Sequence, residues 1–315
     1  MSQVSLIAVD WGTSNLRASL LDAEGSALET RSAPGGIMAV NDGAFSQALL
    51  ALCADWMQQY PCPLIASGMI GSRQGWKEAP YLDCPAGAGE AARLLVSVDI
   101  EGAAVQTSGL VRQLHIVPGL RCLDESEQFD VMRGEETQIW GAGLASGSVA
   151  VLPGTHSKWA WTGAKGAITG FRTYMTGELY ALLTKHGILG RLMVFGESRP
   201  DAFVAGVKVG VNAHAQASHA IFSARTAGLM GRIAPEGLPD YLSGVLIGLE
   251  LGGARALCKD AELREVVLIG DDGLCERYER AFELIGIATA RAADDATTRG
   301  QTIVAQAAGL LGDAS

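Results

Sequence analysis

Two short turns in the sequence combine glycine with hydroxyl side chains, and the second repeats the first in outline. Asp10-Trp11-Gly12-Thr13-Ser14-Asn15 follows an apolar run, and so does Gly154-Thr155-His156-Ser157. Such runs predict buried strands, and the apolar run after each turn predicts a hairpin. A glycine lets the backbone approach a phosphate, which accepts from N–H and hydroxyl groups. The repeat therefore predicts that both turns bind the phosphates of one nucleotide, from opposite sides.

The first turn carries a carboxylate that the second lacks. Asp10 ends its strand, and it is a candidate catalytic residue that could hold Mg²⁺ through water, since Mg²⁺ prefers carboxylate oxygen and keeps several waters. Gly12, Thr13 and Ser14 are the candidate phosphate donors of this turn. The alternative is an ordinary hairpin turn whose polar side chains satisfy only local backbone groups.

The second turn offers Gly154, Thr155, His156 and Ser157 as donors to the β- and γ-phosphates. His156 is interpreted as a phosphate or substrate donor in preference to a free catalytic base. Other nucleotide motifs are weak: the sequence holds no Gly-x-x-x-x-Gly-Lys-Ser/Thr, and Gly87-Ala88-Gly89-Glu90-Ala91-Ala92 follows no clear strand.

Two adjacent acids, Glu135 and Glu136, begin a predicted helix. The helix dipole favours acids at this position, which would explain them without a function. Alternatively, one of them is a catalytic residue that orients the attacking hydroxyl or contacts the metal. The sequence does not choose between the two acids.

The loop from Gly68 to Pro85 is rich in side chains that recognise polar ligands. Its candidate substrate-binding residues are Gly71, Ser72, Arg73, Trp76 and Tyr81. A guanidinium pairs well with a carboxylate, and an indole could cover a sugar face. The alternative is a surface loop held by a salt bridge from Arg73 to Glu78 or Asp83.

A third glycine-containing segment, Ile269-Gly270-Asp271-Asp272-Gly273, lies between a predicted strand and a predicted helix. Gly270, Asp271 and Gly273 are candidate adenosine-binding residues, because glycine lets a nucleoside lie against the backbone. The alternative is a helix cap with Asp272 at the N-cap.

Composition limits the classes of function. The 315-residue chain is 48% hydrophobic and 18% charged, typical of a soluble globular protein that is long enough for two cores. A net charge of −10 argues against nucleic acid as a partner, and no run is long enough to cross a membrane. The six cysteines form no Cys-x-x-Cys pair, which favours free buried thiols in a cytoplasmic protein.

The apolar spacing predicts two α/β lobes with mixed sheets. Strands are expected at 5–11, 15–21, 26–33 and 64–67, and again at 148–153, 158–162, 167–173, 265–269 and 288–290. Helices are expected at 44–60, 178–188, 198–205, 212–230, 239–258, 274–284 and 301–311. The border is expected between Trp140 and Gly147, where glycine and alanine gather.

With these pieces placed, the chain resembles the actin, hexokinase and Hsp70 ATPase superfamily, and within it the 2-dehydro-3-deoxygalactonokinase family. Both turns carry the wider resemblance. The narrower one is carried by the segments 67–76, 79–81 and 132–138, that is Ser-Gly-Met-Ile-Gly-Ser-Arg-Gln-Gly-Trp, Ala-Pro-Tyr and Met-Arg-Gly-Glu-Glu-Thr-Gln.

The resemblance implies two ribonuclease H-like, actin-like ATPase lobes around a central cleft. Residues 1–142 would form the N-terminal lobe with the sugar-acid site, and residues 143–315 the C-terminal lobe with the adenosine site. The terminal helix, about 300–312, would lie near the hinge, where it and the small-residue helix at 244–253 would cross. The implied activity is transfer of phosphate from ATP, with Mg²⁺, to the 6-hydroxyl of 2-dehydro-3-deoxy-D-galactonate.

Two other functions would use the same turns. An actin-like ATPase switch would act through assembly, and a phosphoanhydride hydrolase would use Glu135 or Glu136 to activate water. Substrate stereochemistry and oligomeric state stay open at this point, a homodimer included.

Overall fold

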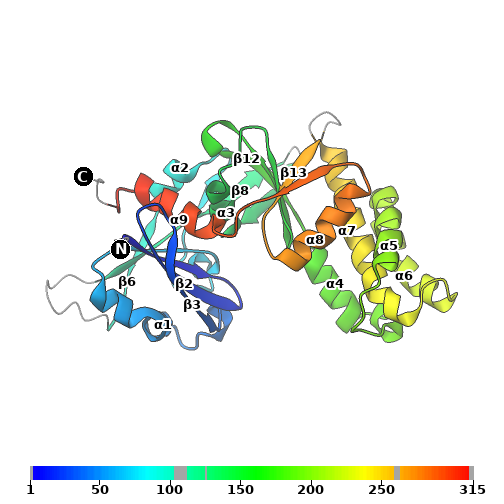
Figure 1. Ribbon diagram of the computed structural model, residues 1–315, viewed down its shortest axis with the longest axis horizontal. Helices are drawn as coiled ribbons and strands as arrows, with labels where there is room; N and C mark the ends of the chain where they lie inside the picture. Colours follow the sequence, from blue (N-terminus) through cyan, green and yellow to red (C-terminus); the bar gives the residue numbers. More distant parts are fainter. Residues whose placement is uncertain (1–2, 103–111, 125, 259–262, 312–315) are drawn as a thin grey trace. The chain divides into compact units, whose positions relative to one another are not determined.

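A computed structural model describes residues 3–102, 112–124, 126–258 and 263–311, and it divides into two compact units (Figure 1). The first unit comprises Met1–Gly147, Trp161–Phe171 and Ala292–Ser315, and the second comprises Ser148–Ala160 and Arg172–Arg291. The chain first passes from the first unit to the second after Gly147, at the end of the stretch 140–147 in which the border was expected. However, residues 161–171 and 292–315 group with the first unit, whereas the sequence placed all of 143–315 in the second lobe.

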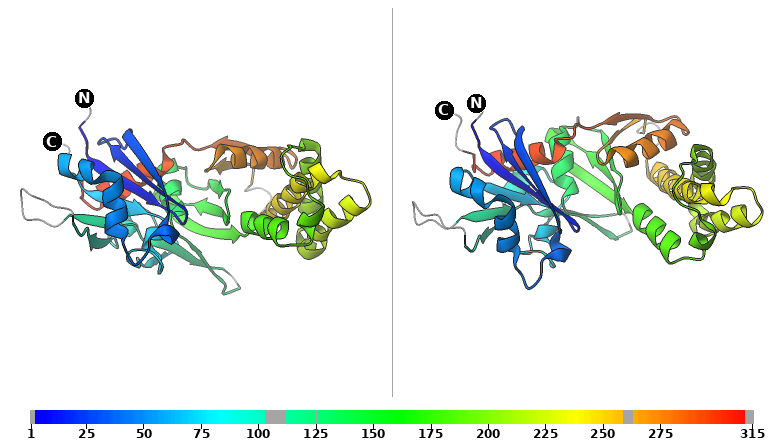
Figure 2. Two further views of the ribbon diagram at one scale, coloured as in Figure 1. Left: turned by 90° about the horizontal axis from the view of Figure 1, so that it is seen from below. Right: turned by 60° about the horizontal axis from the view of Figure 1, so that its bottom comes forward.

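The first unit is built on a six-stranded sheet in the order β3-β2-β1-β4-β7-β6. Its strands are β1 (Leu6–Trp11), β2 (Asn15–Leu21), β3 (Ala27–Pro34), β4 (Leu64–Ser67), β6 (Val96–Asp99) and β7 (Gln113–Ile116). β1, β2 and β3 form an antiparallel meander, seen in blue in Figure 2, while β4 pairs parallel with β1 and with β7. Helix α1 (Phe45–Gln59) supplies buried side chains to the same core. The predicted first strands and helix are confirmed.

A second sheet repeats this order with later strands, as β12-β11-β10-β13-β14. Its strands are β10 (Val149–Leu152), β11 (Ser157–Thr162), β12 (Ile168–Tyr174), β13 (Glu265–Leu268) and β14 (Ala288–Arg291). In both sheets the first strand of the meander lies between the second strand and a later parallel strand. The repeat seen in the two turns therefore extends to five strands of each sheet, and β6 has no counterpart in the second.

A third, three-stranded sheet was not predicted from the sequence. It has the order β5-β8-β9, with β5 (Tyr81–Asp83), β8 (Gly119–Leu123) and β9 (Phe129–Met132). The signal is weak because these strands are short and alternate poorly between apolar and polar residues. β5 follows the loop of candidate substrate residues directly, and β9 leads through Arg133 into helix α3 (Glu135–Ala142).

Helices dominate the rest of the second unit. They are α4 (Thr176–Lys185), α5 (Pro200–Asn212), α6 (Ala217–Leu229), α7 (Leu238–Leu257) and α8 (Asp272–Glu283). The predicted helix at 212–230 is broken, because residues 214–216 form a separate 3-10 turn before α6. None of the described helices is long and apolar enough to cross a membrane. Five of the six cysteines are buried.

Glycines bring α5 and α7 into close contact (Figure 1). A Cβ at Gly206 would lie 2.1 Å from the Tyr241 carbonyl oxygen, and one at Gly244 would lie 2.1 Å from the Phe203 carbonyl oxygen. The small-residue stripe on α7, which the resemblance placed at a hinge crossing, therefore packs on α5 inside the second unit.

The terminal helix α9 (Ala296–Ala307) starts earlier than the predicted 301–311 and ends before Gly309, whose φ is +67°. It packs on α3 in the first unit (Figure 1). A Cβ at Gly141 would lie 1.8 Å from the Ala296 carbonyl oxygen, and one at Gly300 would lie 1.8 Å from the Thr137 carbonyl oxygen. Neither helix can hold a larger residue at this contact.

This close approach gives the first prediction. Gly300→Ala should lower the free energy of unfolding by about 3 kcal/mol or more, because a methyl group would collide with a backbone oxygen that cannot rotate away. Gly89→Ala is the control: this exposed glycine in helix α2 (Ala88–Ala92) has no atom within 4 Å of its Cβ position, and alanine there should stabilise slightly. Urea unfolding measures both. Equal stability of the two variants would contradict the prediction.

Candidate active site

The first Gly-Thr turn connects β1 to β2 and is held from behind by the segment after β3. Three N–H groups of this segment donate to the three carbonyl oxygens of the turn, namely Ile37 to Gly12 (3.0 Å), Met38 to Thr13 (3.4 Å) and Gly35 to Ser14 (3.2 Å). Gly36 lies so close that a Cβ would be 2.2 Å from the Thr13 carbonyl carbon. The turn carbonyls are therefore all occupied on one side.

The opposite side of this turn faces solvent. Thr13 and Ser14 are exposed, and among the described residues no protein group accepts from their backbone N–H groups. A turn whose carbonyls point inward and whose amides point outward is a favourable place for an anion. The assignment of this turn to phosphate binding stays a prediction.

Asp10 lies near the carboxyl end of β1, close to three polar or charged residues. Arg17 is its partner across the β1–β2 hairpin and Ser67 its partner in the parallel strand β4. Burial raises the pKa of the Asp10 carboxyl, the Arg17 guanidinium lowers it, and the Glu135 carboxylate raises it. Asp10 and Glu135, distant in sequence, are therefore close enough to interact.

Two glycines with positive φ make this approach possible. Gly68 has φ +97° and Gly134 has φ +110°. A Cβ at Gly68 would lie 2.8 Å from the Trp11 carbonyl oxygen, and one at Gly134 would lie 3.1 Å from the Gly68 Cα. The ends of β1, β4 and β9 thus converge at Asp10, in a space where side chains on these two residues would not fit.

The structure distinguishes the two acids that the sequence left equal. Glu136 is fully buried, and its carboxylate accepts the Gly134 N–H at 2.7 and 2.8 Å and the Thr137 hydroxyl at 3.2 Å. Glu135 is half-buried, and it accepts the Arg133 N–H at 3.0 Å. Only Glu135 is accessible to a ligand beside Asp10, whereas Glu136 closes the first turn of α3 from within.

The candidate substrate loop divides into buried and exposed residues. The Arg73 side chain is 87% exposed and forms a salt bridge of 2.9 Å with Glu78, which is the alternative considered from the sequence. Trp76 stacks on Phe45 and meets Trp11 edge-on, with ring centroids 6.0 and 6.4 Å apart. It therefore packs on the core of the first unit.

The inner part of the same loop surrounds a buried arginine that sequence reasoning missed. Arg133 is 7% exposed, donates to the Ala79 carbonyl oxygen (2.8 Å) and lies 4.3 Å above the Tyr81 ring. A Cβ at Gly71 would lie 3.0 Å from its Nη1. Among the described residues, the Nε and Nη1 of Arg133 and the hydroxyl of Ser72 are buried without a hydrogen-bond partner. Unpaired buried polar groups are unusual and often mark a functional site.

Helix α9 contributes a second residue that the sequence did not reveal. The Gln301 side chain is 1% exposed, and its amide donates to the Val9 carbonyl oxygen (2.7 Å) and to the Ser67 hydroxyl (2.9 Å). These hydrogen bonds hold β1 at the residue before Asp10, and they hold β4 at the residue before Gly68. No local pattern could indicate a contact between residues so far apart in the chain.

The second turn is also supported by the segment that follows the third strand of its meander, here through one backbone hydrogen bond. The Glu178 N–H at the start of α4 donates to the Thr155 carbonyl oxygen (3.0 Å), and a Cβ at Gly177 would lie 2.5 Å from the Gly154 carbonyl oxygen. Thr155 and His156 are exposed, and His156 Nε2 lies 2.5 Å from Glu178 Oε2. Ser157 differs from the prediction: it is fully buried, and its hydroxyl donates to Glu250 instead of facing a phosphate.

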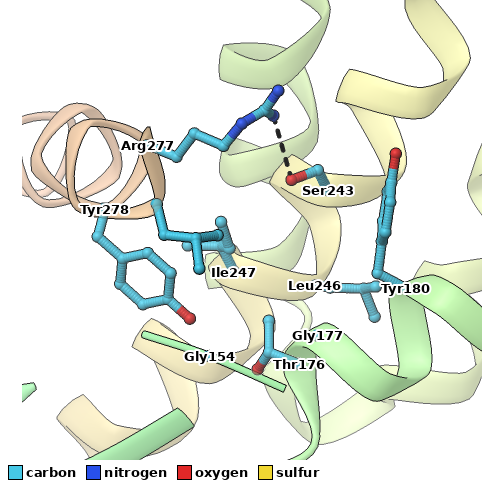
Figure 3. Close-up of a pocket in the computed structure, with 10 residues that line it drawn as sticks. Gly154, Thr176, Gly177, Tyr180, Ser243, Leu246, Ile247, Arg277 and Tyr278 are labelled. Carbon is cyan, nitrogen blue, oxygen red and sulfur yellow. Dashed lines mark hydrogen bonds between the residues drawn. The ribbon is translucent and has the colours of Figure 1, made fainter. Parts of the chain in front are cut away.

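A pocket of about 210 Å³ opens beside this turn within the second unit (Figure 3). Its apolar wall is formed by Leu246, Ile247 and Leu274, and its polar groups come from Thr176, Ser243, Arg277 and Tyr278, with Gly154 at one end. The Arg277 guanidinium donates to the Ser243 hydroxyl (3.3 Å) and pairs with Asp240 (2.8 Å). An apolar recess with a few polar groups is the usual form of a small-molecule site, and a nucleoside is a suitable occupant.

The candidate adenosine segment lies next to this pocket. A Cβ at Gly270, where φ is +149°, would be 3.5 Å from the Pro153 carbonyl oxygen. Asp271 is the N-cap of α8, accepting the N–H groups of Gly273 (3.0 Å) and Leu274 (3.2 Å). The cap proposed for Asp272 is therefore one residue off, because Asp272 already has helical backbone and pairs with Arg291. Gly273 lines a neighbouring recess together with Arg277.

Comparison with known proteins connects this geometry to a family. Residues 10–304 match the family described as 2-keto-3-deoxy-galactonokinase. The chain belongs to this family. A curated relative from Escherichia coli K12, named 2-dehydro-3-deoxygalactonokinase, is 36% identical over 96% of this chain and 97% of its own length.

Solved structures agree with this assignment. A crystal structure from Sinorhizobium meliloti that carries the 2-dehydro-3-deoxygalactonokinase name has a TM-score of 0.85 and 34% identity, covering 96% of this chain and 98% of that one. A ligand-bound xylulose kinase from Lactobacillus acidophilus, 12% identical with a TM-score of 0.52, covers 98% of this chain and 90% of its own and shares only the fold. The chain is thus a sugar kinase, a transferase, with the predicted actin-like ATPase fold.

The first unit of this kinase fits a magnesium ion with few protein ligands. In the described part of the chain, no group of three or more His, Cys, Asp and Glu residues could hold a metal. Mg²⁺ is commonly bound by one or two carboxylates with water and substrate phosphates, and Asp10 is such a carboxylate. Burial raises the pKa of the Asp10 carboxyl, and a bound cation would favour its ionised form. The prediction that both turns bind one triphosphate concerns two separate units and stays a prediction.

The buried Glu136 gives a prediction for stability against pH. Burial raises the pKa of its carboxyl to about 7 from an ordinary 4.5, with Glu135 acting in the same direction. Between these values the folded state binds more protons than the unfolded state, so the free energy of unfolding falls as pH rises, by about 3 kcal/mol in total. Glu136→Gln should remove this fall and stabilise the kinase at about pH 8 relative to wild type.

Urea unfolding at about pH 5 and about pH 8 measures the difference. Glu24→Gln, at an exposed position in the same unit, is the matched control and should keep the wild-type slope. A Glu136→Gln variant with the same pH dependence as wild type would disprove the assignment.

Proposed function

We propose that this kinase transfers the γ-phosphoryl group of ATP, with Mg²⁺, to the 6-hydroxyl of 2-dehydro-3-deoxy-D-galactonate. The observation that carries the proposal is the family match over residues 10–304. The Escherichia coli relative that bears the name of this activity extends over almost the whole chain. The candidate residues of the site lie inside the matched range.

Phosphate binding is assigned to the backbone of the two turns. Thr13 and Ser14 in the first unit, and Thr155 and His156 in the second, are exposed at turns whose carbonyls are held from behind. Gly12 and Gly154 keep side chains away from the approaching phosphate. The protein has a net charge of −10, so local amides and a bound cation, and not the overall field, would have to bind this anion.

Glu135 is assigned as the base that receives the proton of the sugar hydroxyl, with Asp10 beside it as the residue that would hold Mg²⁺. When bound, the ion would neutralise the charge on the phosphates. Phosphoryl transfer has a loose transition state, so positioning does most of the work and a base adds a factor of about 10²–10⁴. Glu135 is half-buried, and its charge raises the pKa of the Asp10 carboxyl. Both observations favour Glu135 over the fully buried Glu136 as the base.

The sugar acid is placed on the first unit, against the inner face of the loop that carries Gly71 and Ser72, with Tyr81 at its side. The unpartnered hydroxyl of Ser72 supports a polar ligand here. Arg73 remains a candidate for the substrate carboxylate, for which it would have to exchange its partner Glu78. The adenosine would occupy the pocket between Gly154 and Arg277 in the second unit.

The direct experiment couples ADP formation by the purified protein to a detectable reaction, with a panel of keto-deoxy sugar acids as acceptors. We expect turnover with 2-dehydro-3-deoxy-D-galactonate and little ATP hydrolysis without an acceptor. Phosphate release without acceptor would favour the phosphoanhydride hydrolase, and ATP-dependent light scattering would favour the assembling switch. The proposal fails if no keto-deoxy sugar acid stimulates ADP formation.

Two variants test the assigned acids. Glu135→Gln should lower kcat by about 10²–10⁴ while KM for ATP stays close to wild type, because a base acts only in the transition state. Asp10→Asn should also lose mainly kcat. Glu136→Gln, one residue further along the helix, should lose far less. If Glu136→Gln loses as much activity as Glu135→Gln, the choice between these acids is wrong.

A further inference from the structure

One carboxylate in the second unit accepts four hydrogen bonds and belongs to none of the motifs described above. Glu250 on α7 is 2% exposed. Its Oε1 accepts from the Ser157 hydroxyl (2.7 Å) and the Trp159 indole (2.8 Å), and its Oε2 accepts from the Thr176 and Tyr278 hydroxyls (both 2.5 Å). Both oxygens thus accept two hydrogen bonds each, from donors on three elements, β11, α4 and α8.

These four donors come from the elements that build the nucleotide site. Ser157 ends the second Gly-Thr turn and begins β11. Thr176 begins α4, directly before the Gly177 and Glu178 backbone that holds the turn from behind. Tyr278, with Thr176, lines the pocket, and Figure 3 shows the hydroxyls of both residues on the side of the pocket nearest Gly154. Glu250 therefore joins the turn, its support and the pocket wall.

Hydrophobic packing alone does not explain a carboxylate at this position. Burial raises the pKa of Glu250, and the four donors offset this increase only in part. Among the described residues no lysine or arginine forms an ion pair with it. Such a buried charge is costly and is kept only where every lone pair is satisfied. A glutamine of the same shape would turn an amide N–H₂ toward hydroxyl or indole donors.

We propose that Glu250 is a positioning residue for nucleotide binding, which holds the second Gly-Thr turn and the pocket wall in the conformation that receives the phosphates of a nucleoside diphosphate or triphosphate. This rests on the proposed function only in that the second unit binds the nucleotide. The proposed role of Glu250 does not depend on where or whether a sugar acid binds. Glu250 touches neither reacting group and acts through Ser157, Thr176 and Tyr278.

The test compares Glu250→Gln with wild type in calorimetric titration with ADP and Mg²⁺, and in steady-state kinetics. We expect the affinity for ADP to fall by about tenfold or more, since hydrogen bonds to a charged group are lost. KM for ATP should rise in parallel, while KM for the sugar acid stays unchanged. Glu265→Gln, which removes a charge from an exposed site at the start of β13, is the control and should bind ADP as wild type does.

A purely structural role gives a different result. In that case, Glu250→Gln lowers the melting temperature but the folded variant binds ADP with wild-type affinity, and the proposal is overturned. If Glu250→Gln does not fold, Trp159→Phe decides, because it removes the indole donor to Glu250 Oε1 and Trp159 does not line the pocket. The folded Trp159→Phe variant should bind ADP about fivefold more weakly than wild type or worse, since a hydrogen bond to a charged group is lost. Wild-type ADP affinity in that variant also overturns the proposal.

The outcome is separable from that of the proposed function. Wild-type protein that binds ADP but phosphorylates no sugar acid would remove the proposed function and leave the role of Glu250 open to the same comparison. Wild-type protein that binds no ADP would overturn the role of Glu250 as well.

Discussion

The site depends on the orientation of peptide groups in two short turns. A turn can bind an anion through its amides only when its carbonyl oxygens point elsewhere, because a carbonyl facing a phosphate would repel it. In the first unit the turn carbonyls accept from the amides of Gly35, Ile37 and Met38, and in the second unit the Thr155 carbonyl accepts from the amide of Glu178 at the start of α4. Gly36 and Gly177 are the residues that allow these supports to lie against the turns.

The same solution therefore appears twice, although the supporting segments differ. After β3 the chain makes a glycine pair and a 3-10 turn, whereas after β12 it enters a regular helix. In each case the support follows the third strand of the meander and returns to the hairpin between the first two. The two halves thus share their topology and the use of a glycine-mediated support for the turn, and they differ in the secondary structure of that support.

The sequence revealed those parts of the site that depend on neighbouring residues. Both turns, their flanking strands and the helix start at Glu135 carry local signals, since each needs a particular residue type at a fixed spacing. Gly36 and Gly177 carry no such signal, because what makes them necessary is a contact with another turn. Gln301 and Glu250 are hidden for the same reason. Their polar side chains lie on helices that the apolar spacing predicts, and only the fold shows that these side chains are buried.

Three acids illustrate how environment separates residues of one chemical type. Burial raises the pKa of Asp10, Glu136 and Glu250, yet their partners differ. Asp10 faces a cation and another carboxylate, Glu136 accepts a backbone amide of its own helix start, and Glu250 accepts four side-chain donors. The more hydrogen bonds a carboxylate accepts from the protein, the fewer lone pairs remain for a ligand. By this measure Asp10 alone retains capacity for a metal ion, while Glu136 and Glu250 serve to keep the surrounding backbone in place.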